Sequence, residues 1–156
     1  MKRKTVFISG ASSGIGRSTA ILLAKSNYNV SLGARRLDRL EELKNEIESS
    51  GGTAAIHRLD VTDSVSFKNA IDRTVEKFGK IDGLINNAGI MPISFLSELK
   101  IDEWNQMIDV NVKGVLNGVA AVIPYMLTQK EGHIINISSM AGHIVMPSTS
   151  VYSATK

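Results

Sequence analysis

The sequence predicts an α/β domain built around an open, doubly wound sheet of parallel strands. Two observations support this fold class. Short apolar runs alternate along the chain with longer segments of helical periodicity, and strands separated by helices form parallel βαβ units. A glycine-rich turn, Gly10–Gly16, joins the first apolar run to the first helical segment. Ligands of such a fold bind beyond the carboxyl ends of the strands, which is where the motifs described below fall.

The first part of the chain predicts two strand–helix units. Thr5–Ser9 is β-branched, aromatic and nearly unbroken in apolar character, which is typical of a strand covered on both faces. The next segment, Gly14–Ser26, has helical spacing at Ile15, Thr19, Leu22 and Leu23. Asn29–Ala34 is expected to form the second strand. The second helix is expected over Leu37–Ser49, because one face collects Leu37, Leu40, Leu43 and Ile47 and because Gly51 and Gly52 stop it.

The same alternation continues to the end of the chain. Further strands are expected at Thr53–Arg58, Gly83–Asn86 and Gly132–Ile137. Asp63 is expected to cap a helix that runs through Phe78, with an apolar stripe formed by Val65, Ala70, Ile71, Val75 and Phe78. A long helix is expected from about Asp102 to Thr128, with Pro124 near its last turns.

Composition restricts the possible functions. The 156 residues suit a single domain, 1–156, and a hydrophobic share of 43% with a charged share of 21% is ordinary for a soluble globular protein. The chain has no cysteine and three scattered histidines, so we expect no disulfide and no metal site. Its net charge of +3 is not gathered into a basic block with aromatics, so no nucleic-acid partner is expected. No signal peptide is visible and no apolar run approaches membrane-spanning length, which predicts no membrane partner and a cytoplasmic location.

The glycine-rich turn indicates dinucleotide binding. Gly10 permits a tight turn, Gly14 lets backbone N–H groups approach a diphosphate at a helix N-terminus, and Gly16 allows close packing. Ser12, Ser13 and Ile15 belong to the same turn and are candidate cofactor contacts. Three residues separate Gly10 from Gly14, where the common G-x-G-x-x-G fingerprint has one, so the position between a strand and a helix carries the inference.

The end of the second predicted strand indicates which dinucleotide binds. A carboxylate there would accept a hydrogen bond from the 2′-hydroxyl of NAD, whereas guanidinium groups suit a 2′-phosphate. The residues present are Ala34, Arg35 and Arg36, so we favour NADP(H) over NAD(H). Solvated arginines at a helix start are the alternative, although that placement is unfavourable against the helix dipole.

Tyr152 and Lys156 form a candidate proton-transfer pair. Their spacing of four residues places both side chains on one face of a helix. A cation beside a phenol favours the phenolate, so a tyrosine in this setting could exchange protons with an alcohol or a carbonyl.

Taken together, these motifs closely resemble those of the short-chain dehydrogenase/reductase family, in its single-domain oxidoreductase branch with a Rossmann fold. The matching segments are Gly10–Gly16, Asn86–Gly89, Asn111, Ser139 and Tyr152–Lys156. Ser139 lies thirteen residues before Tyr152, the spacing that this family usually has. The resemblance implies an oxidoreductase that transfers a hydride between NADP(H) and an alcohol, aldehyde or ketone, and that assembles as a homodimer or homotetramer.

The resemblance also implies a role for each matched residue. Tyr152 would be the general acid/base, and Lys156 would favour its ionised form and hold the nicotinamide ribose. Ser139 would bind the substrate oxygen together with Tyr152, and Asn111 would order a water that relays protons from Lys156. Cofactor contacts implied after the third and fourth strands are Asp60, Val61, Asn87, Ala88 and Gly89.

Two other interpretations remain open at this point. The chain could be a dinucleotide-binding or interaction module without catalysis, because members of the family continue well past the lysine with further strands and a substrate-covering loop. The sheet is therefore expected to be truncated after the fifth strand, to leave that strand as an uncovered edge, and to belong to a domain that lacks its C-terminal part. Nucleotide-sugar epimerases and dehydratases share the Tyr-x-x-x-Lys pair, but their glycine turn is usually spaced differently.

Overall fold

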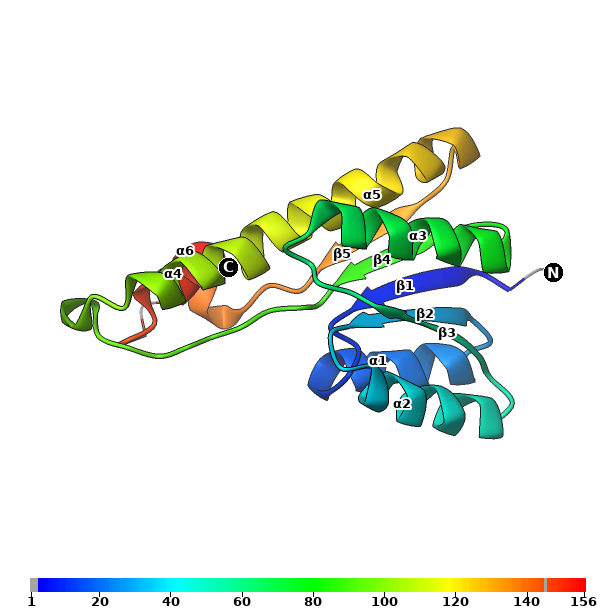
Figure 1. The fold of residues 1–156 in the computed structure, drawn as a ribbon, viewed down its shortest axis with the longest axis horizontal. Coiled ribbons are helices and arrows are strands. Elements are labelled where there is room, and N and C mark those ends of the chain that lie inside the picture. The colour runs from blue at the N-terminus through cyan, green and yellow to red at the C-terminus, as the bar shows by residue number, and fades with distance from the viewer. Residues whose placement is uncertain (1–2, 145) are drawn as a thin grey trace.

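The computed structural model describes residues 3–144 and 146–156 and contains a five-stranded parallel sheet (Figure 1). The strand order is β3-β2-β1-β4-β5, with β1 in the centre and neighbours paired in parallel. The strands are β1 (Thr5–Ser9), β2 (Asn29–Ala34), β3 (Thr53–Arg58), β4 (Gly83–Asn86) and β5 (His133–Asn136). The predicted doubly wound sheet is confirmed, and the expected bounds of the first four strands agree with the structure.

Helices cover both faces of this sheet. Helices α1 (Gly14–Lys25) and α2 (Leu37–Ser49) pack on one face, and α3 (Ser64–Phe78) and α5 (Gly114–Gln129) pack on the other (Figure 1). The chain leaves β1 toward one side and returns through β4 on the other side, so the topological switch point lies between β1 and β4. In open α/β sheets this is the position at which ligands bind.

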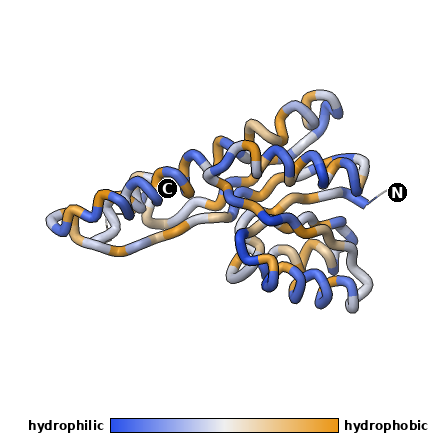
Figure 2. Tube along the Cα trace, in the orientation of Figure 1, coloured by the Kyte–Doolittle hydropathy of each residue, from blue (hydrophilic) through white to orange (hydrophobic). Residues whose placement is uncertain are grey.

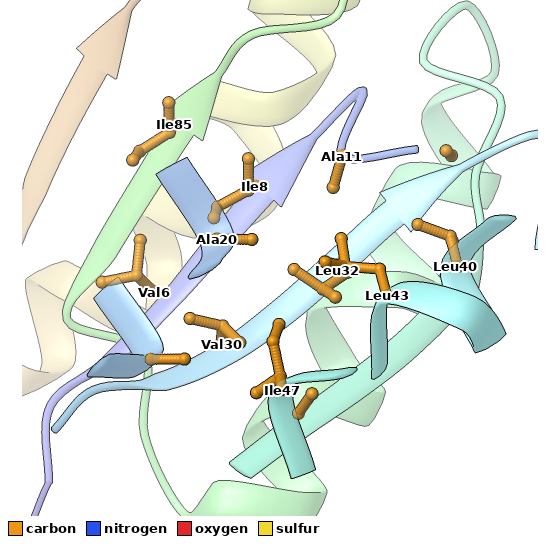
Figure 3. Packing of buried hydrophobic residues seen from close by; sticks show 13 residues of the cluster. Val6, Ile8, Ala11, Ala20, Val30, Leu32, Leu40, Leu43, Ile47 and Ile85 are labelled. Atoms are coloured by element: carbon orange, nitrogen blue, oxygen red, sulfur yellow. The ribbon is translucent and has the colours of Figure 1, made fainter. Parts of the chain in front are cut away.

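The face under α1 and α2 carries an aliphatic core (Figure 3). Strand residues such as Ile8, Leu32 and Ile85 belong to one cluster with Leu40, Leu43 and Ile47 of α2, and Leu32 lies beside Leu43. Figure 2 shows that hydrophilic segments recur on the outer turns of α2. The predicted α2 stripe is confirmed except at Leu37, which is 40% exposed.

Helix α1 buries a different face from the one that its large residues indicated. The buried positions are Gly16, Ala20 and Ala24, whereas Ile15 and Leu22 are about two-thirds exposed, at 64% and 65%. Gly16 packs against the backbone of the glycine turn, so the helix lies too close to the sheet for a large side chain on that face. Close approach therefore overrides the hydrophobic periodicity here.

The opposite face of the sheet is covered by α3 and α5. Asp63 caps α3 as predicted, because its carboxylate accepts hydrogen bonds from the backbone N–H groups of Val65, at 2.8 Å, and Ser66, at 3.2 Å. Ala70 and Ile71 are buried as expected, but Val65 is 64% exposed and Phe67, outside the predicted stripe, is fully buried. The ring of Phe67 lies 5.8 Å from that of Phe7 in β1.

The long predicted helix is present but is not uniform. Helix α4 (Ile101–Ile108) passes through a π-helical turn at Asp109–Lys113 into α5. A π-turn of this kind inserts an extra residue into the helix and is frequent at functional sites. A further short helix, α6 (Ser150–Thr155), packs against α4 in the part of the molecule that extends beyond the sheet (Figure 1).

Among the described residues, the stretch Ile101–Gln129 is long and apolar enough to cross a membrane by length and composition. This differs from the expectation that no apolar run approaches that length. The stretch packs against α3, and three of its side chains donate to backbone carbonyls outside it, from Asn111 to Ile90, from Asn117 to Val61 and from Gln129 to Ile81. We therefore interpret it as a helix that packs on this domain, with 28% of its most apolar window buried.

Strand β5 forms one edge of the sheet, as expected. It pairs with β4, and Ile135 in its middle is 42% exposed. An apolar strand at an open edge can pair with another chain.

A buried polar cluster joins β2, β3 and α3. The Nε2 atom of His57 lies 2.9 Å from the Ser31 hydroxyl, which lies 2.6 Å from that of Thr74. The Thr74 hydroxyl donates its proton to the carbonyl of Ala70, so it accepts the hydrogen bond from the Ser31 hydroxyl. The Ser31 oxygen in turn accepts from His57, whose Nε2 atom therefore carries a proton. Burial lowers the pKa of His57 to about 4, and the positive charges of Arg73 and Lys77 act in the same direction.

Because of this lowered pKa, we expect the free energy of unfolding to decrease as the pH falls from 6.5 to about 4. In that window the unfolded chain binds a proton at His57 that the folded chain does not. The contribution is therefore complete above pH 6.5 and is lost toward pH 4. Urea denaturation at stepped pH should give a shallower dependence for His57→Gln than for the parent or for His133→Gln, which alters an exposed histidine. Equal slopes for all three would contradict this account.

Candidate active site

A cavity of about 700 Å³ lies at the carboxyl ends of the central strands. Its walls come from the loops that follow β1, β2, β3 and β4, together with α4 and the start of the π-turn. Ten of the predicted cofactor contacts line it: Gly10, Ser12, Ser13, Arg35, Arg36, Asp60, Val61, Asn87, Ala88 and Gly89. Four segments distant in sequence therefore converge where the topological switch point predicts a ligand site.

The glycine turn forms the base of this cavity and requires its glycines for different reasons. Gly10 has a φ of +67°, and a Cβ there would lie 2.8 Å from the Cα of Ala88. A Cβ on Gly16 would lie 2.6 Å from the carbonyl oxygen of Gly10. Gly14 has a φ of +57° but faces open space, so its conformation and not its surroundings favours glycine. Gly14, Ile15 and Gly16 begin α1 beside the cavity and are not among its lining residues.

The N-terminus of α1 presents backbone donors next to the cavity. Ser13 occupies the N-cap position, and within the described part of the chain its side chain forms no capping hydrogen bond. Backbone N–H groups at a helix start and the positive end of the helix dipole both favour an anion. The turn is thus suited to a diphosphate.

Ser9 and Asn87 join the glycine turn to the loop after β4. The Ser9 hydroxyl accepts hydrogen bonds from the backbone N–H groups of Asn87, at 3.1 Å, and Ala88, at 3.2 Å. In return, the Asn87 side-chain amide donates to the carbonyls of Ser9 and Gly10. The two loops therefore hold each other. Sequence reasoning missed Ser9, although a hydroxyl at the end of a buried strand is a signal that could have pointed to it.

Positive charge gathers at the end of β2. The Arg36 guanidinium donates to the hydroxyls of Ser12, at 3.1 Å, and Ser13, at 3.0 Å, and Arg35 lines the cavity beside it. The pKa of Asp60 is lowered, first by hydrogen bonds from the hydroxyl and backbone N–H of Thr62 and further by the charge of Arg35, whereas partial burial acts the other way. Arginine cations and serine hydroxyls thus lie side by side at the end of β2, and the carboxylate of Asp60 lies on the loop after β3.

A polar face of α4, continued by the first residue of the π-turn, forms another wall that the sequence did not identify. Its members recur at helical spacing and are Asp102, Asn105, Gln106 and Asp109. Asp102 had been assigned only to the helix start, and it does lie in the first turn of α4. The spacing indicates a solvent-facing side of the helix, but the sequence alone does not indicate that this side faces the cavity.

Asn111 connects the cavity to α6. Its side-chain oxygen accepts from the backbone N–H of Ile90 at 2.9 Å, and its amide donates to the Ile90 carbonyl and to the Thr155 hydroxyl, both at 2.9 Å. Asn111 is 4% exposed and lies inside the π-turn, so it is a buried residue of the long helix and not a solvated one.

The remaining predicted catalytic residues do not line the cavity, and Lys156 lies next to its wall at Gly89. The Lys156 ammonium donates to the carbonyl of Ile137 at 2.8 Å and lies 6.0 Å from the ring centre of Tyr152. It would be only 3.4 Å from a Cβ on Gly89, which lines the cavity. The Ser139 hydroxyl accepts from the backbone N–H of Ala141 at 3.2 Å. Tyr152, Ser139 and Lys156 are not among the residues that line the cavity itself.

The chain matches the family model described as short chain dehydrogenase over residues 4–156. The chain belongs to the short-chain dehydrogenase/reductase family. An uncharacterized oxidoreductase of Staphylococcus saprophyticus is 53% identical over the whole chain, which spans 63% of that relative's length. The chain therefore spans less than two-thirds of the length of such relatives.

Solved structures agree with this assignment. A gluconate 5-dehydrogenase from Burkholderia cenocepacia, in complex with NADP and tartrate, is 31% identical and superimposes with a TM-score of 0.93, with 100% of this chain and 61% of that one covered. An NAD+-bound xylitol dehydrogenase is also 31% identical, with a TM-score of 0.94 and coverage of 98% and 59%. Nicotinamide dinucleotides bind to both of these proteins. The family therefore consists of oxidoreductases that bind nicotinamide dinucleotides. Some members bind NAD and others bind NADP.

Proposed function

We propose that this short-chain dehydrogenase/reductase acts as an NADP(H)-dependent oxidoreductase that interconverts an alcohol with an aldehyde or ketone. The observation that carries the proposal is the position of the Lys156 ammonium, which lies beside the cavity residue Gly89 and 6.0 Å from the ring centre of Tyr152. A cation thus lies next to both a phenol ring and a residue that lines the cavity. This combination is suited to proton transfer to or from a bound oxygen.

The residues present fit a nicotinamide dinucleotide. The start of α1, where the described residues form no side-chain cap, suits a diphosphate, and Gly10 places no side chain on the wall of the cavity. Asp60 and Val61 would flank the adenine, and Asn87, Ala88 and Gly89 would line the path toward Lys156. The nicotinamide, when bound, supplies the hydride chemistry.

The chain's own residues would handle the charge and the proton. Reduction of a carbonyl places negative charge on its oxygen, which needs a hydrogen-bond donor and a proton source. Ser139 would donate to that oxygen and Tyr152 would supply the proton. Lys156 would favour the ionised form of Tyr152, and Asn111 would order a water that relays protons from Lys156.

The charges at the end of β2 favour NADP(H). Arg35 and Arg36 both stand beside the cavity, and Arg36 already points to the hydroxyls of Ser12 and Ser13. Forked guanidinium donors and serine hydroxyls together suit a 2′-phosphate. Ala34, the last residue of β2, offers no carboxylate for the 2′-hydroxyl of NAD.

Replacement of Tyr152 by phenylalanine in the intact protein tests the reaction. We expect Tyr152→Phe to lower turnover by at least about 100-fold, because general acid–base catalysis contributes that much, while NADPH still binds. Turnover is followed by NADPH oxidation with a panel of aldehydes and ketones, and binding by titration. Tyr125→Phe, which removes a hydroxyl that bonds to Asp72 on α3, should retain activity. Full activity of Tyr152→Phe would contradict the assignment, and NADPH binding without turnover in the parent would favour the non-catalytic module.

The cofactor preference has its own test. We expect Arg35→Asp to reduce the ratio of NADPH to NADH affinity by about 10- to 100-fold, because it removes a charge-assisted bond to the 2′-phosphate and repels that group. Both dissociation constants are measured by fluorescence titration. Arg39→Asp makes the same charge change on the exposed side of α2, where Arg39 pairs with Glu42, and should leave the ratio unchanged. Equal affinity of the parent for the two cofactors would refute the preference.

We also propose that the protein forms a homo-oligomer through the long helix. Large apolar side chains on α4, the π-turn and α5 remain 38–71% exposed, namely Ile108, Val112, Leu116, Ile123 and Leu127. Their spacing places them along the helix, and an exposed apolar stripe of this kind marks an interaction surface. Light scattering should give a dimer or tetramer for the parent and a smaller species for Leu116→Glu. A monomeric parent would contradict the proposal.

A further inference from the structure

We propose that Thr155 is a positioning residue, whose hydroxyl fixes the turn that carries Tyr152 and Lys156 onto Asn111. This inference rests on the proposed function, since it concerns how that site is held together. Thr155 itself is directed away from the reacting groups, toward the π-turn. It therefore acts through its neighbours.

The hydroxyl completes a directed relay of hydrogen bonds. The Ile90 N–H donates to the Asn111 carboxamide, which donates in turn to the Thr155 hydroxyl at 2.9 Å. The Thr155 hydroxyl donates its one proton to the carbonyl of Tyr152 at 2.7 Å. Asn111 uses both amide protons and its oxygen, and Thr155 both accepts and donates, so each polar atom in the relay has a partner.

The short length of α6 makes this relay important. The helix spans six residues, Ser150–Thr155, and a helix of that length is marginal without contacts from elsewhere. Within the described chain, its long-range side-chain hydrogen bond is the one that the Thr155 hydroxyl accepts from Asn111, and Lys156, directly after the helix, donates to Ile137 and accepts from Ser138. Among the described residues, the Thr155 bond is the one long-range side-chain hydrogen bond that joins a residue of α6 itself to the π-turn, and it restricts the rotation of the helix there. Because Tyr152 and Lys156 share one face, that rotation sets where both point.

Removal of the hydroxyl would also leave Asn111 with a buried amide proton and no acceptor. Asn111 is 4% exposed, so water cannot readily replace the lost partner. The carboxamide would then be free to rotate, and its two hydrogen bonds to the backbone of Ile90, which lines the cavity, would be weakened. A change at Thr155 would thus reach both Lys156 and the loop after β4.

The experiment compares Thr155→Val and Thr155→Ser in the intact protein. We expect Thr155→Val to lower kcat about tenfold or more, since small displacements of reacting groups are costly, while the dissociation constant of NADPH changes less than about threefold. Thr155→Ser should stay within about threefold of the parent kcat because it retains the hydroxyl. Thr128→Val is the matched control: that hydroxyl donates to the Pro124 carbonyl on the exposed side of α5, and its loss should leave kcat unchanged.

Hydrogen exchange supplies a readout that does not depend on activity. The backbone amides of Ser153–Lys156 should exchange faster in Thr155→Val than in the parent or in Thr155→Ser. Unchanged kcat and exchange in Thr155→Val, or equal losses in the valine and serine variants, would overturn the proposal. If the parent has no turnover, the proposed function fails, and the exchange rates alone decide the positioning role.

Discussion

The carboxamide of Asn111 is the interaction on which the arrangement of the candidate site depends. It is buried in the π-turn of the long helix and binds the backbone of Ile90 on both sides, so it fixes the loop that follows β4. The same group reaches α6 through Thr155. Three segments that are far apart in the sequence meet at one side chain, and a polar group so deeply buried is favourable only when all of its bonds are made.

A second carboxamide also fixes the long helix relative to β4. Gln129, at the far end of α5, accepts from the N–H and donates to the carbonyl of Ile81 just before β4. Asn111 makes the same pair of bonds to Ile90 just after β4. The helix is therefore attached at both ends of the same strand. The π-turn, which changes the phase of the helix, lies at the attachment next to the cavity and not at the remote one. The irregular helix geometry thus coincides with the position where Lys156 is placed.

The sequence predicted the sheet well because strands buried on both faces have a strong pattern. The runs Thr5–Ser9 and Asn29–Ala34 are strands with the expected bounds, and the cap at Asp63 is present. Local chemistry also identified the lining residues in the loops after β1 and β2, whereas those after β3 and β4 were implied by the resemblance to the family. These features depend on neighbours in the chain, and a single sequence carries that information.

The features that were missed depend on contacts between distant segments. Large residues at Ile15 and Leu22 suggested the wrong buried face of α1, because the close approach of Gly16 to the turn is a tertiary constraint. The polar face of α4 could be recognised as polar but not as a wall of the cavity. Thr155 has no local pattern that distinguishes it from any helical threonine, and only the position of Asn111 gives its hydroxyl a second partner.

The most direct test of this account is a crystal structure of the intact protein with NADP(H) bound. The account predicts that the carboxamide of Asn111 keeps its bonds to Ile90 and Thr155 and that the ammonium of Lys156 and the ring hydroxyl of Tyr152 both face the nicotinamide end of the cofactor. A ring hydroxyl directed away from the nicotinamide while the Asn111 bonds are intact would contradict it.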